Sequence, residues 1–288
     1  MKKCRVKADR QKTDARTALN LLRDMLAKGL PVDGFHYSTV LSALADCGRY
    51  REAKTLLESM NAGASGTAPN VYHFNSVITA FARGRRPWVE ALEVFRNMTE
   101  AEVAPNKISY NTLITAIANT GSWEKALDVF QQMKTAGSTP DTITYSTLIT
   151  AIATGAQWDV ALAVYTDAVV EGTLVSKRLG SGRDELLDLH FLSSSIAVVT
   201  VLHELLRLWE LWRPDPVRVD RDLRIITGRG AGSEDGKAVL LPVVLLFLNE
   251  GMRPRLQAEQ DSSNPGCIRI RCEDLDAWFQ AQNAVGRP

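Results

Sequence analysis

The pair of residues that points most directly to chemistry is Asp188 and His190, two positions apart in the apolar segment 186–191. Residues i and i+2 of a β-strand project from one face, so we expect these side chains to lie together. Histidine, with an ordinary pKa of about 6.5, suits acid–base work on a water molecule or a ribose hydroxyl, and a nearby carboxylate orients it. The alternatives are a divalent metal ion bound by the Asp/His pair and a purely structural strand histidine.

A glycine-containing turn downstream adds groups that bind phosphate. It reads Thr227-Gly228-Arg229-Gly230. Backbone N–H groups of such a turn can bind phosphate oxygens, and the Arg229 guanidinium can stabilise charge on a pentavalent phosphorus. The two segments together predict a phosphodiester site whose catalytic residues are Asp188, His190, Thr227, Gly228, Arg229 and Gly230.

The first 176 residues contain four similar segments, each anchored by an aromatic residue at position 37, 74, 110 or 145. In the third segment, Tyr110, Leu113, Ile114 and Ile117 recur at i, i+3, i+4 and i+7, the period of an amphipathic helix, and a second such run follows Gly121. Ser122 is expected to cap that second helix. A period near 35 residues therefore predicts helix–turn–helix units that stack into an α-solenoid.

Prolines mark the ends of the units. Pro69, Pro105 and Pro140 each precede an Asn or Asp that leads into the next unit. Four complete repeats are expected, at 34–70, 71–106, 107–141 and 142–176. Residues 1–33 are interpreted as an N-terminal arm and an incomplete repeat, either because the chain is the C-terminal part of a longer array or because residues 1–16 form an atypical cap.

After a Gly/Ser/Arg-rich linker at 177–184, the hydrophobic pattern changes from helical repeats to alternating strands and helices. Strands are expected at 186–191, at 223–226 before the glycine turn, near 253–260 and near 267–272, with helices at 193–212 and 237–249. The fold class is therefore an α-solenoid followed by a small α/β domain of order βαβαββ, at 185–282.

Composition narrows the functional classes. The chain has 288 residues, 45% hydrophobic and 23% charged, with net charge +1, as expected of a folded protein without a general attraction for nucleic acid. Its four cysteines lack metal-site spacing, which excludes a zinc site or disulfide scaffold and favours a reducing compartment. Its apolar runs are too short to span a membrane, and the basic N-terminus has no targeting peptide pattern.

The repeats resemble the pentatricopeptide repeat family, with its TYNTLI-like first helix, its G-x-x-x-x-A turn and its G-x-x-P-[DN] exit. The tetratricopeptide pattern W-x-x-L-G-x-x-Y is absent. The resemblance implies that each repeat reads one base of single-stranded RNA. The reading pairs join the residue after the anchoring aromatic to the last residue of the unit: Ser38 with Asn70, Asn75 with Asn106, Asn111 with Asp141, and Ser146 with Ser176.

By the family's code these pairs imply the register 5′-A-Y-U-N-3′. Residues two before each aromatic would sandwich neighbouring bases; these are Phe35, Tyr72, Ile108 and Ile143. The alternative for Asn75 and Asn111 is a helix N-terminal side chain that satisfies backbone groups. Aromatic residues that start the second helices (Tyr50, Trp88, Trp123 and Trp158) are expected in the core. His36 and His73 are expected either to contact the RNA backbone or to lie exposed.

The C-terminal segment resembles the small MutS-related (Smr) domain, which in plant and algal proteins often follows pentatricopeptide repeats. Residues 187–190 match its L-D-x-H motif and residues 227–230 its T-G-x-G motif, but Phe191 stands where the family usually has glycine. The resemblance implies an organellar RNA-binding protein, plastid or alternatively mitochondrial, whose Smr domain is expected to be an endonuclease, with a divalent metal ion as its candidate cofactor. The alternatives are a non-catalytic RNA binder and a scaffold that contacts proteins of plastid gene expression and signalling.

Overall fold

A computed structural model describes residues 2–62, 66–84, 88–175, 177–178, 185–214, 219, 221–228 and 238–285, without the side chains of 2–13, 177, 178, 185 and 285. The chain forms two compact units, Met1–Gly155 and Ala156–Pro288. Their boundary falls inside the expected fourth repeat, 142–176, because the second helix of that repeat packs with the C-terminal unit. No described helix has the length and apolar character needed to cross a membrane.

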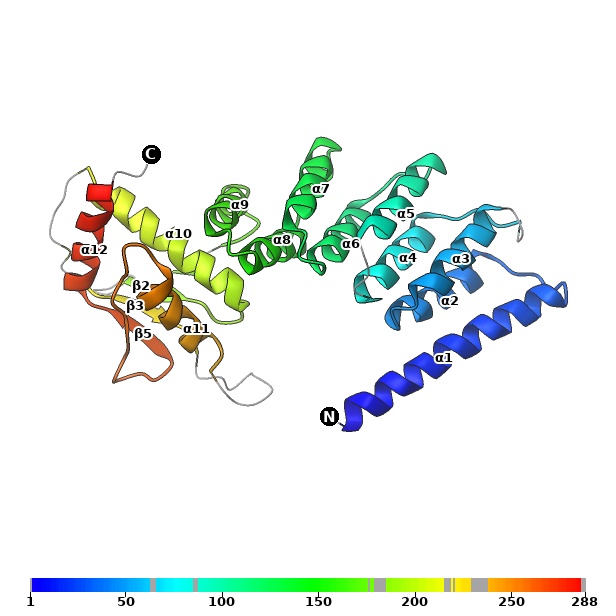
Figure 1. Ribbon diagram of the computed structural model, residues 1–288, viewed down its shortest axis with the longest axis horizontal. Helices are drawn as coiled ribbons and strands as arrows, with labels where there is room; N and C mark the ends of the chain where they lie inside the picture. Colours follow the sequence, from blue (N-terminus) through cyan, green and yellow to red (C-terminus); the bar gives the residue numbers. More distant parts are fainter. Residues whose placement is uncertain are drawn as a thin grey trace. The chain divides into compact units, whose positions relative to one another are not determined.

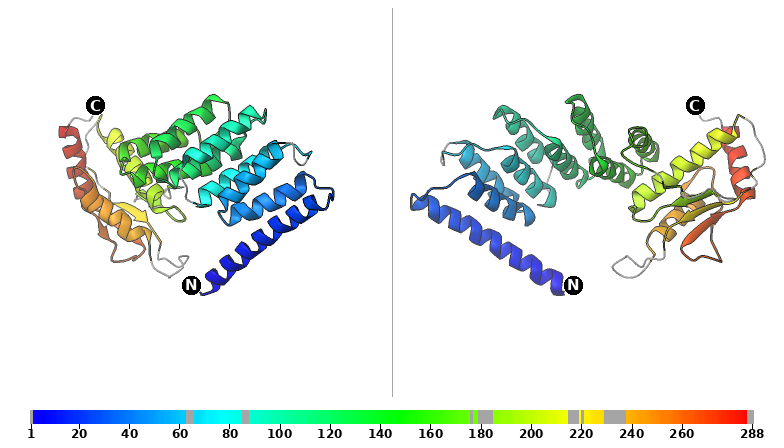
Figure 2. Two further views of the ribbon diagram at one scale, coloured as in Figure 1. Left: turned by 45° about the vertical axis from the view of Figure 1, so that its right-hand side comes forward. Right: turned by 180° about the vertical axis from the view of Figure 1, so that it is seen from behind.

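The first unit consists of α-helices joined by short turns (Figure 1). In chain order they are α1 (Lys2–Ala27), α2 (Gly34–Asp46), α3 (Tyr50–Asn61), α4 (Val71–Gly84), α5 (Trp88–Glu100), α6 (Lys107–Ala118), α7 (Trp123–Thr135) and α8 (Thr142–Thr154). The first helices of successive repeats contact one another in the series α2, α4, α6 and α8, and the second helices α3, α5 and α7 each pack on the first helix of their own repeat and of the next. Figure 2 shows this row of helices from two further directions. The prediction of a helix–turn–helix solenoid is therefore confirmed.

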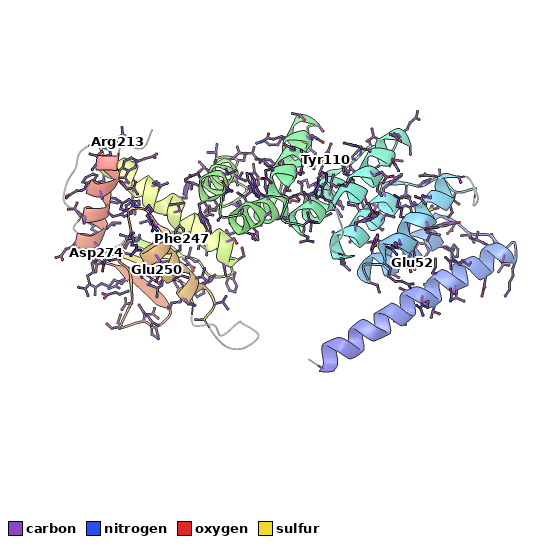
Figure 3. The ribbon with its side chains drawn as sticks, in the orientation of Figure 1. Glu52, Tyr110, Arg213, Phe247, Glu250 and Asp274 are labelled. Atoms are coloured by element: carbon purple, nitrogen blue, oxygen red, sulfur yellow. The ribbon has the colours of Figure 1, made fainter. Side chains whose placement is uncertain are left out.

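Aromatic residues hold the two layers of helices together. The second helices α3, α5 and α7 begin at the expected aromatics, and Tyr50 lies with its ring centroid 5.0 Å from that of Phe81 on α4. Phe95 of α5 packs edge-on against Tyr110 of α6, with the centroids 5.2 Å apart. Tyr110 is labelled among the side chains of the first unit in Figure 3. Phe81, Phe95 and Tyr110 are buried in the core, whereas the aromatics that were expected there are only partly buried: Tyr50, Trp88, Trp123 and Trp158. Ser122 occupies the N-cap position of α7 as expected, but its side chain makes no capping hydrogen bond.

The N-terminal segment differs from the expected arm and partial repeat. Residues Lys2–Ala27 form the single helix α1, which packs on α2. Ala15, Leu19 and Leu22 are buried in that contact at the i, i+4 and i+7 spacing of one helix face. Residues that were interpreted as an arm and an incomplete repeat thus form one continuous helix.

The second unit contains a five-stranded sheet and helices (Figure 1). Its elements are α9 (Trp158–Val170), β1 (Lys177–Arg178), β2 (Glu185–Asp188), α10 (Ser194–Trp212), β3 (Leu223–Ile226), α11 (Leu240–Leu246), a π-helical turn (Phe247–Gly251), β4 (Glu259–Gln260), β5 (Cys267–Ile270) and α12 (Cys272–Val285). The strand order is β1-β2-β3-β5-β4. Strands β2 and β3 are parallel, joined through α10, and the other neighbours are antiparallel.

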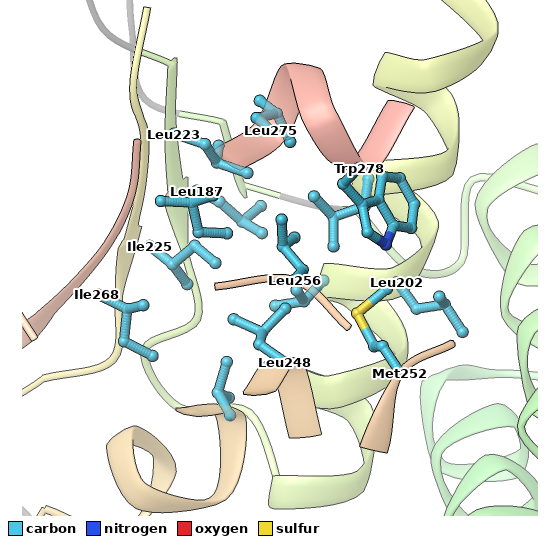
Figure 4. Packing of buried hydrophobic residues seen from close by; sticks show 14 of the residues in the cluster. Leu187, Leu202, Leu223, Ile225, Leu248, Met252, Leu256, Ile268, Leu275 and Trp278 are labelled. Carbon is cyan, nitrogen blue, oxygen red and sulfur yellow. The ribbon is translucent and has the colours of Figure 1, made fainter. Parts of the chain in front are cut away.

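The core of this unit lies between the sheet and its helices (Figure 4). Leu187, Ile225 and Ile268 come from three adjacent strands and contact apolar residues of α10, the π-helical turn and α12. Trp158 and Leu162 of α9 pack against the same cluster, with Trp158 5.3 Å from Phe247 between ring centroids. This apolar contact explains why α9 groups with the sheet.

The observed elements depart from the expected βαβαββ order at both ends. Strand β1 lies within the expected linker, and helix α12, which was not expected, follows β5 and runs three residues past the expected domain end at 282. The spacing of Leu275, Trp278 and Phe279 is helical and all three are buried, so the sequence carried a signal for α12. Strand β2 ends at Asp188 rather than at 191, and α11 with its π-helical turn covers 240–251 rather than 237–249.

Candidate RNA-reading pairs and phosphodiester site

Asn75 and Asn106, predicted to act as a pair, are joined by a hydrogen bond in the structure. Asn106 caps α6, since its Oδ1 accepts a hydrogen bond from the backbone N–H of Ser109 at 3.0 Å. The same oxygen accepts one from Nδ2 of Asn75 at 3.4 Å. The last residue of this repeat therefore caps the first helix of the next repeat and also holds the Asn75 amide of its own repeat.

Asn111 and Asp141 repeat this arrangement with an additional bond. Asp141 caps α8 by accepting from the backbone N–H of Thr144 at 3.0 Å, and it accepts from Nδ2 of Asn111 at 3.2 Å. The Thr144 hydroxyl in turn donates to Oδ1 of Asn111 at 2.5 Å. Both ends of the Asn111 amide are thus held by the protein, whereas Oδ1 of Asn75 is buried without a hydrogen-bond partner among the described residues.

The first predicted pair, Ser38 with Asn70, is interrupted by His73. Nδ1 of His73 accepts from the backbone N–H of Asn70 at 3.0 Å, and its Nε2 lies 3.0 Å from Oγ of Ser38 and 3.0 Å from the Gly34 carbonyl oxygen. His73 is completely buried. The expectation that it contacts RNA backbone or lies exposed is therefore wrong, because it occupies the capping position that Ser109 and Thr144 take in later repeats.

Asn75 and Asn111 do not cap a helix N-terminus, which was the alternative role predicted for them. The capping residues are the partners Asn106 and Asp141, while both asparagines lie within the first helices. Ser176, the last member of the predicted set, lies outside the described residues, so the structure does not describe its pairing with Ser146.

Large apolar side chains stand exposed at the second residue of each first helix. Phe35 is 77% exposed, Tyr72 68%, Ile108 56% and Ile143 64%. These are the residues predicted to sandwich bases. Four equivalent helix positions that all leave apolar surface in water are typical of a ligand-binding face rather than of chance exposure.

The charge on Asp141 is stabilised by its neighbours. Burial acts to raise the pKa of this carboxyl, but hydrogen bonds from Thr144 and Asn111 outweigh that effect and hold the pKa below its ordinary value. A carboxylate at the N-terminus of α8 also interacts favourably with the helix dipole. The ionised Asp141 carboxylate can therefore accept hydrogen bonds but cannot donate them.

The Asp188 and His190 side chains meet, but not through strand alternation. Oδ1 of Asp188 lies 2.6 Å from Nδ1 of His190 and accepts from the His190 backbone N–H at 2.9 Å. Strand β2 has ended at Asp188, so the contact comes from a local turn in which the aspartate bonds the backbone two residues ahead. The aspartate is mostly buried, while the histidine side chain is 43% exposed.

Gly228 lies directly against the imidazole. Its φ is +79°, and a Cβ at this position would stand 2.9 Å from Nε2 of His190. The carbonyl oxygen of Gly266 accepts from the backbone N–H groups of Thr227, at 2.9 Å, and of Gly228, at 3.1 Å. The Gly228 N–H is therefore engaged, which corrects the expectation that it is offered to a phosphate. Arg229 and Gly230 lie outside the described residues.

Phe191 follows the histidine with φ of +68° and 98% exposure. Its ring centroid is 6.0 Å from that of His190. Among the described residues, no cluster of three Asp, Glu, His or Cys side chains is arranged to hold a metal ion. Asp188 and His190 offer two ligands, which is too few to define a metal centre on their own.

Sequence reasoning missed the roles of His73, Thr144 and Gly266. The third residue of each first helix is His36, His73, Ser109 or Thr144, and all four side chains can hydrogen-bond a helix N-terminus, so a capping-box signal was present. The contacts of Gly266 had no sequence signal, since they depend on β3 pairing with β5.

The first unit is thus a helical-repeat solenoid whose first helices are capped by the last residue of the preceding repeat. Residues 20–84 match the family model described as pentatricopeptide repeat domain, and residues 69–119 and 105–154 match the model described as PPR repeat family. This part of the chain is therefore an array of pentatricopeptide repeats.

Known proteins share this array over part of their length. A chloroplastic pentatricopeptide repeat-containing protein 10 of Zea mays is 33% identical over 96 residues, which is 33% of this chain and 12% of that protein. A mitochondrial relative from Arabidopsis thaliana is 26% identical over 98 residues, covering 34% of this chain and 16% of its own. The chain thus spans less than a fifth of the length of either relative.

One solved structure aligns with part of this chain. The pentatricopeptide repeat protein PPR10, in complex with an 18-nt psaJ RNA element, aligns with a TM-score of 0.48 at 22% identity. The alignment covers 67% of this chain and 26% of that one.

Proposed function

We propose that residues 34–176 form four pentatricopeptide repeats that bind single-stranded RNA, one base per repeat. The observation that carries this proposal is the repeated bond between the two predicted reading residues, Asn75 with Asn106 and Asn111 with Asp141. Exposed apolar side chains stand at the positions expected to sandwich the bases. Polar groups held by the protein and flanked by apolar surface are what base recognition requires.

The names of the relatives support an organellar location for this activity. They are chloroplastic or mitochondrial proteins, and PPR10 was solved with an RNA element. We therefore place the protein in an organelle, in RNA processing or expression. The register is 5′-A-Y-U-N-3′, with uracil assigned to Asn111 and Asp141.

The substitution Asp141→Asn tests the reading pairs. It makes the third pair identical to the second, Asn with Asn, and asparagine still caps a helix as Asn106 does. The preference for uracil over cytosine at the third base should fall while total affinity is largely kept. Dissociation constants for RNAs with A-Y-U and A-Y-C cores measure this. Asp128→Asn, an exposed carboxylate on α7 that pairs with Lys125, is the matched control. An unchanged uracil-to-cytosine ratio in Asp141→Asn would contradict the assignment.

We also propose that the second unit contains an Smr-like domain at 185–282, which follows the linker at 177–184. This domain would nick the bound RNA. Its support is the Asp188–His190 contact of 2.6 Å. With Nδ1 held by the carboxylate, the Nε2 lone pair can take a proton from a ribose hydroxyl or a water molecule that attacks phosphorus. A divalent metal, if bound, would activate that water or neutralise the phosphate.

Cleavage of end-labelled single-stranded RNA tests this role. Wild type should cut, and Asp188→Ala and His190→Ala should each lose about 100-fold or more in rate, since both act in one proton transfer. Chelation by EDTA separates metal-dependent from metal-free cleavage. Binding without cleavage in all three proteins would instead support the alternative, a non-catalytic binder or stabiliser, which the engaged Gly228 N–H and the bulky Phe191 favour. Capture of organellar gene-expression proteins independent of RNA would support a scaffold.

A further inference from the structure

Phe191 sits at a turn position that suits glycine. The Leu192 N–H donates to the Leu189 carbonyl oxygen at 3.2 Å, closing a four-residue turn with His190 second and Phe191 third. A positive φ at the third position is the type II pattern, in which glycine is favoured because a Cβ is strained there. The turn that presents His190 thus forces an aromatic residue into a left-handed conformation, with φ of +68°.

Burial of the Phe191 side chain does not offset this backbone strain. Its side chain is 98% exposed, more than any other large apolar side chain among the described residues. Other non-glycine residues with positive φ, Glu102 and Ala156, put a polar or a small side chain at such a position. A strained and exposed phenylalanine is therefore unfavourable for stability, and strain of this kind is typical of functional positions.

The position of the Phe191 ring indicates which part of a ligand it would contact. It lies 6.0 Å from the imidazole of His190, between ring centroids, and the histidine contacts Asp188 at 2.6 Å. A phosphodiester that reaches this pair brings its flanking base within reach of an exposed aromatic face. Bases of every kind stack on such faces, each contributing measurably to affinity.

We propose that Phe191 is a stacking platform for one nucleobase of single-stranded RNA, beside the Asp188–His190 pair. This inference rests on the proposed function, because it assumes that RNA reaches the second unit. Stacking beside the pair would hold the adjacent phosphate in place and would make Phe191 a determinant of where the RNA is cut or clamped.

The experiment compares RNA affinity with thermal stability in the full chain. The His190→Ala background prevents cleavage, and the probe is a single-stranded RNA of about 16 nucleotides with a fluorescent adenine analogue that is quenched by stacking. Phe191→Gly should raise the dissociation constant about 5- to 20-fold and abolish part of the quenching, while the melting temperature rises by about 2 to 6 °C because strain is relieved. Phe191→Trp should keep both affinity and quenching, whereas Phe191→Leu should lose them.

Leu211→Ala, an exposed apolar residue at the end of α10, is the matched control and should leave RNA affinity unchanged. If RNA binds but Phe191→Gly and Phe191→Leu bind it as tightly as the background protein, the platform is refuted and the proposed function stands. If the chain binds no RNA at all, both are refuted.

Discussion

At the scale of single residues, the hydroxyl of Thr144 connects a helix cap to a predicted reading residue. It accepts from the Asp141 backbone N–H at 3.0 Å and donates to Oδ1 of Asn111. Thr144 is only 1% exposed, so water cannot replace these bonds. The arrangement fixes which end of the Asn111 amide faces Asp141, since the oxygen is already occupied.

Thr144→Val removes this hydroxyl at nearly constant shape. Two buried polar groups, the Asp141 N–H and the Asn111 Oδ1, lose a partner, and we expect a loss of about 1–3 kcal/mol in the free energy of unfolding. Denaturant unfolding measures it. The control is Thr112→Val, whose hydroxyl bonds only the carbonyl oxygen four residues earlier on a more exposed face, and which should change stability by about 0.5 kcal/mol or less. Equal effects of the two substitutions would contradict the bridging role.

The depressed pKa of Asp141 makes stability depend on pH. Burial opposes the ionised form of this carboxyl, but hydrogen bonds from Thr144 and Asn111 outweigh it. Because the folded pKa lies below the unfolded value of about 3.9, the contribution of the carboxylate is present above that pH and is lost as pH falls through the folded pKa. Unfolding free energies measured across acidic pH should therefore fall less steeply in Asp141→Asn than in wild type. Asp128→Asn should keep the wild-type slope, and an identical slope in Asp141→Asn would refute the linkage.

At the scale of elements, the ends of β2 and β3 bring the candidate phosphodiester site together. The two strands are parallel, with Asp188 opposite Ile226, so the turns that follow them lie side by side. The close approach of His190 to Gly228 is a consequence, and it leaves no room for a Cβ. Gly266, just before β5, fixes the second turn by accepting two backbone hydrogen bonds.

Gly228→Ala should therefore disturb the histidine. Gly172→Ala is the matched control, because Gly172 also has a positive φ, +71°, but nothing lies within 4 Å of its added Cβ. We expect about 1 kcal/mol of destabilisation from backbone strain for Gly172→Ala and about 2–3 kcal/mol for Gly228→Ala. Only Gly228→Ala should shift the NMR resonances of the His190 ring. A shift of the same size in Gly172→Ala, or none in Gly228→Ala, would contradict the contact.

At the scale of the whole molecule, the two units are stabilised in different ways. In the first unit the substantial contacts among the described residues join each helix to helices one or two places along the chain, so its stability is approximately a sum of local terms. The second unit has one cluster shared by strands and helices distant in sequence. Opening is therefore expected to be graded along the first unit and cooperative in the second.

Hydrogen exchange followed by mass spectrometry tests the graded opening. Helices α4 and α6 contact helices on both sides within the first unit, whereas α1 packs only on α2 at the level of substantial contacts among described residues. Amides of α1 should exchange about 10-fold or more faster than those of α4 and α6, because α1 can detach without opening them. Equal protection of the three helices would show that the unit opens as a whole.

The sequence by itself determined the repeats and the starts of their helices, whereas the residues that cap the first helices came from the structure. These features depend on local causes, namely the helical period of apolar residues, prolines before the caps, and aromatics such as Trp123 that begin the second helices. It also placed Asp188 near His190, although through strand alternation rather than through the turn that is present. The helical spacing of Leu275, Trp278 and Phe279 would also have predicted helix α12.

Only the tertiary structure decided what depends on residues far apart in the chain. His73 separates Ser38 from Asn70, Thr144 holds Asn111, and Gly266 takes the N–H of Gly228. Helix α9, a repeat helix by its sequence, packs on the core of the second unit through Trp158. The physical reason is that a side chain's hydrogen-bond capacity and apolar surface are used by whichever groups the fold brings near, and the local sequence pattern carries no information about those partners.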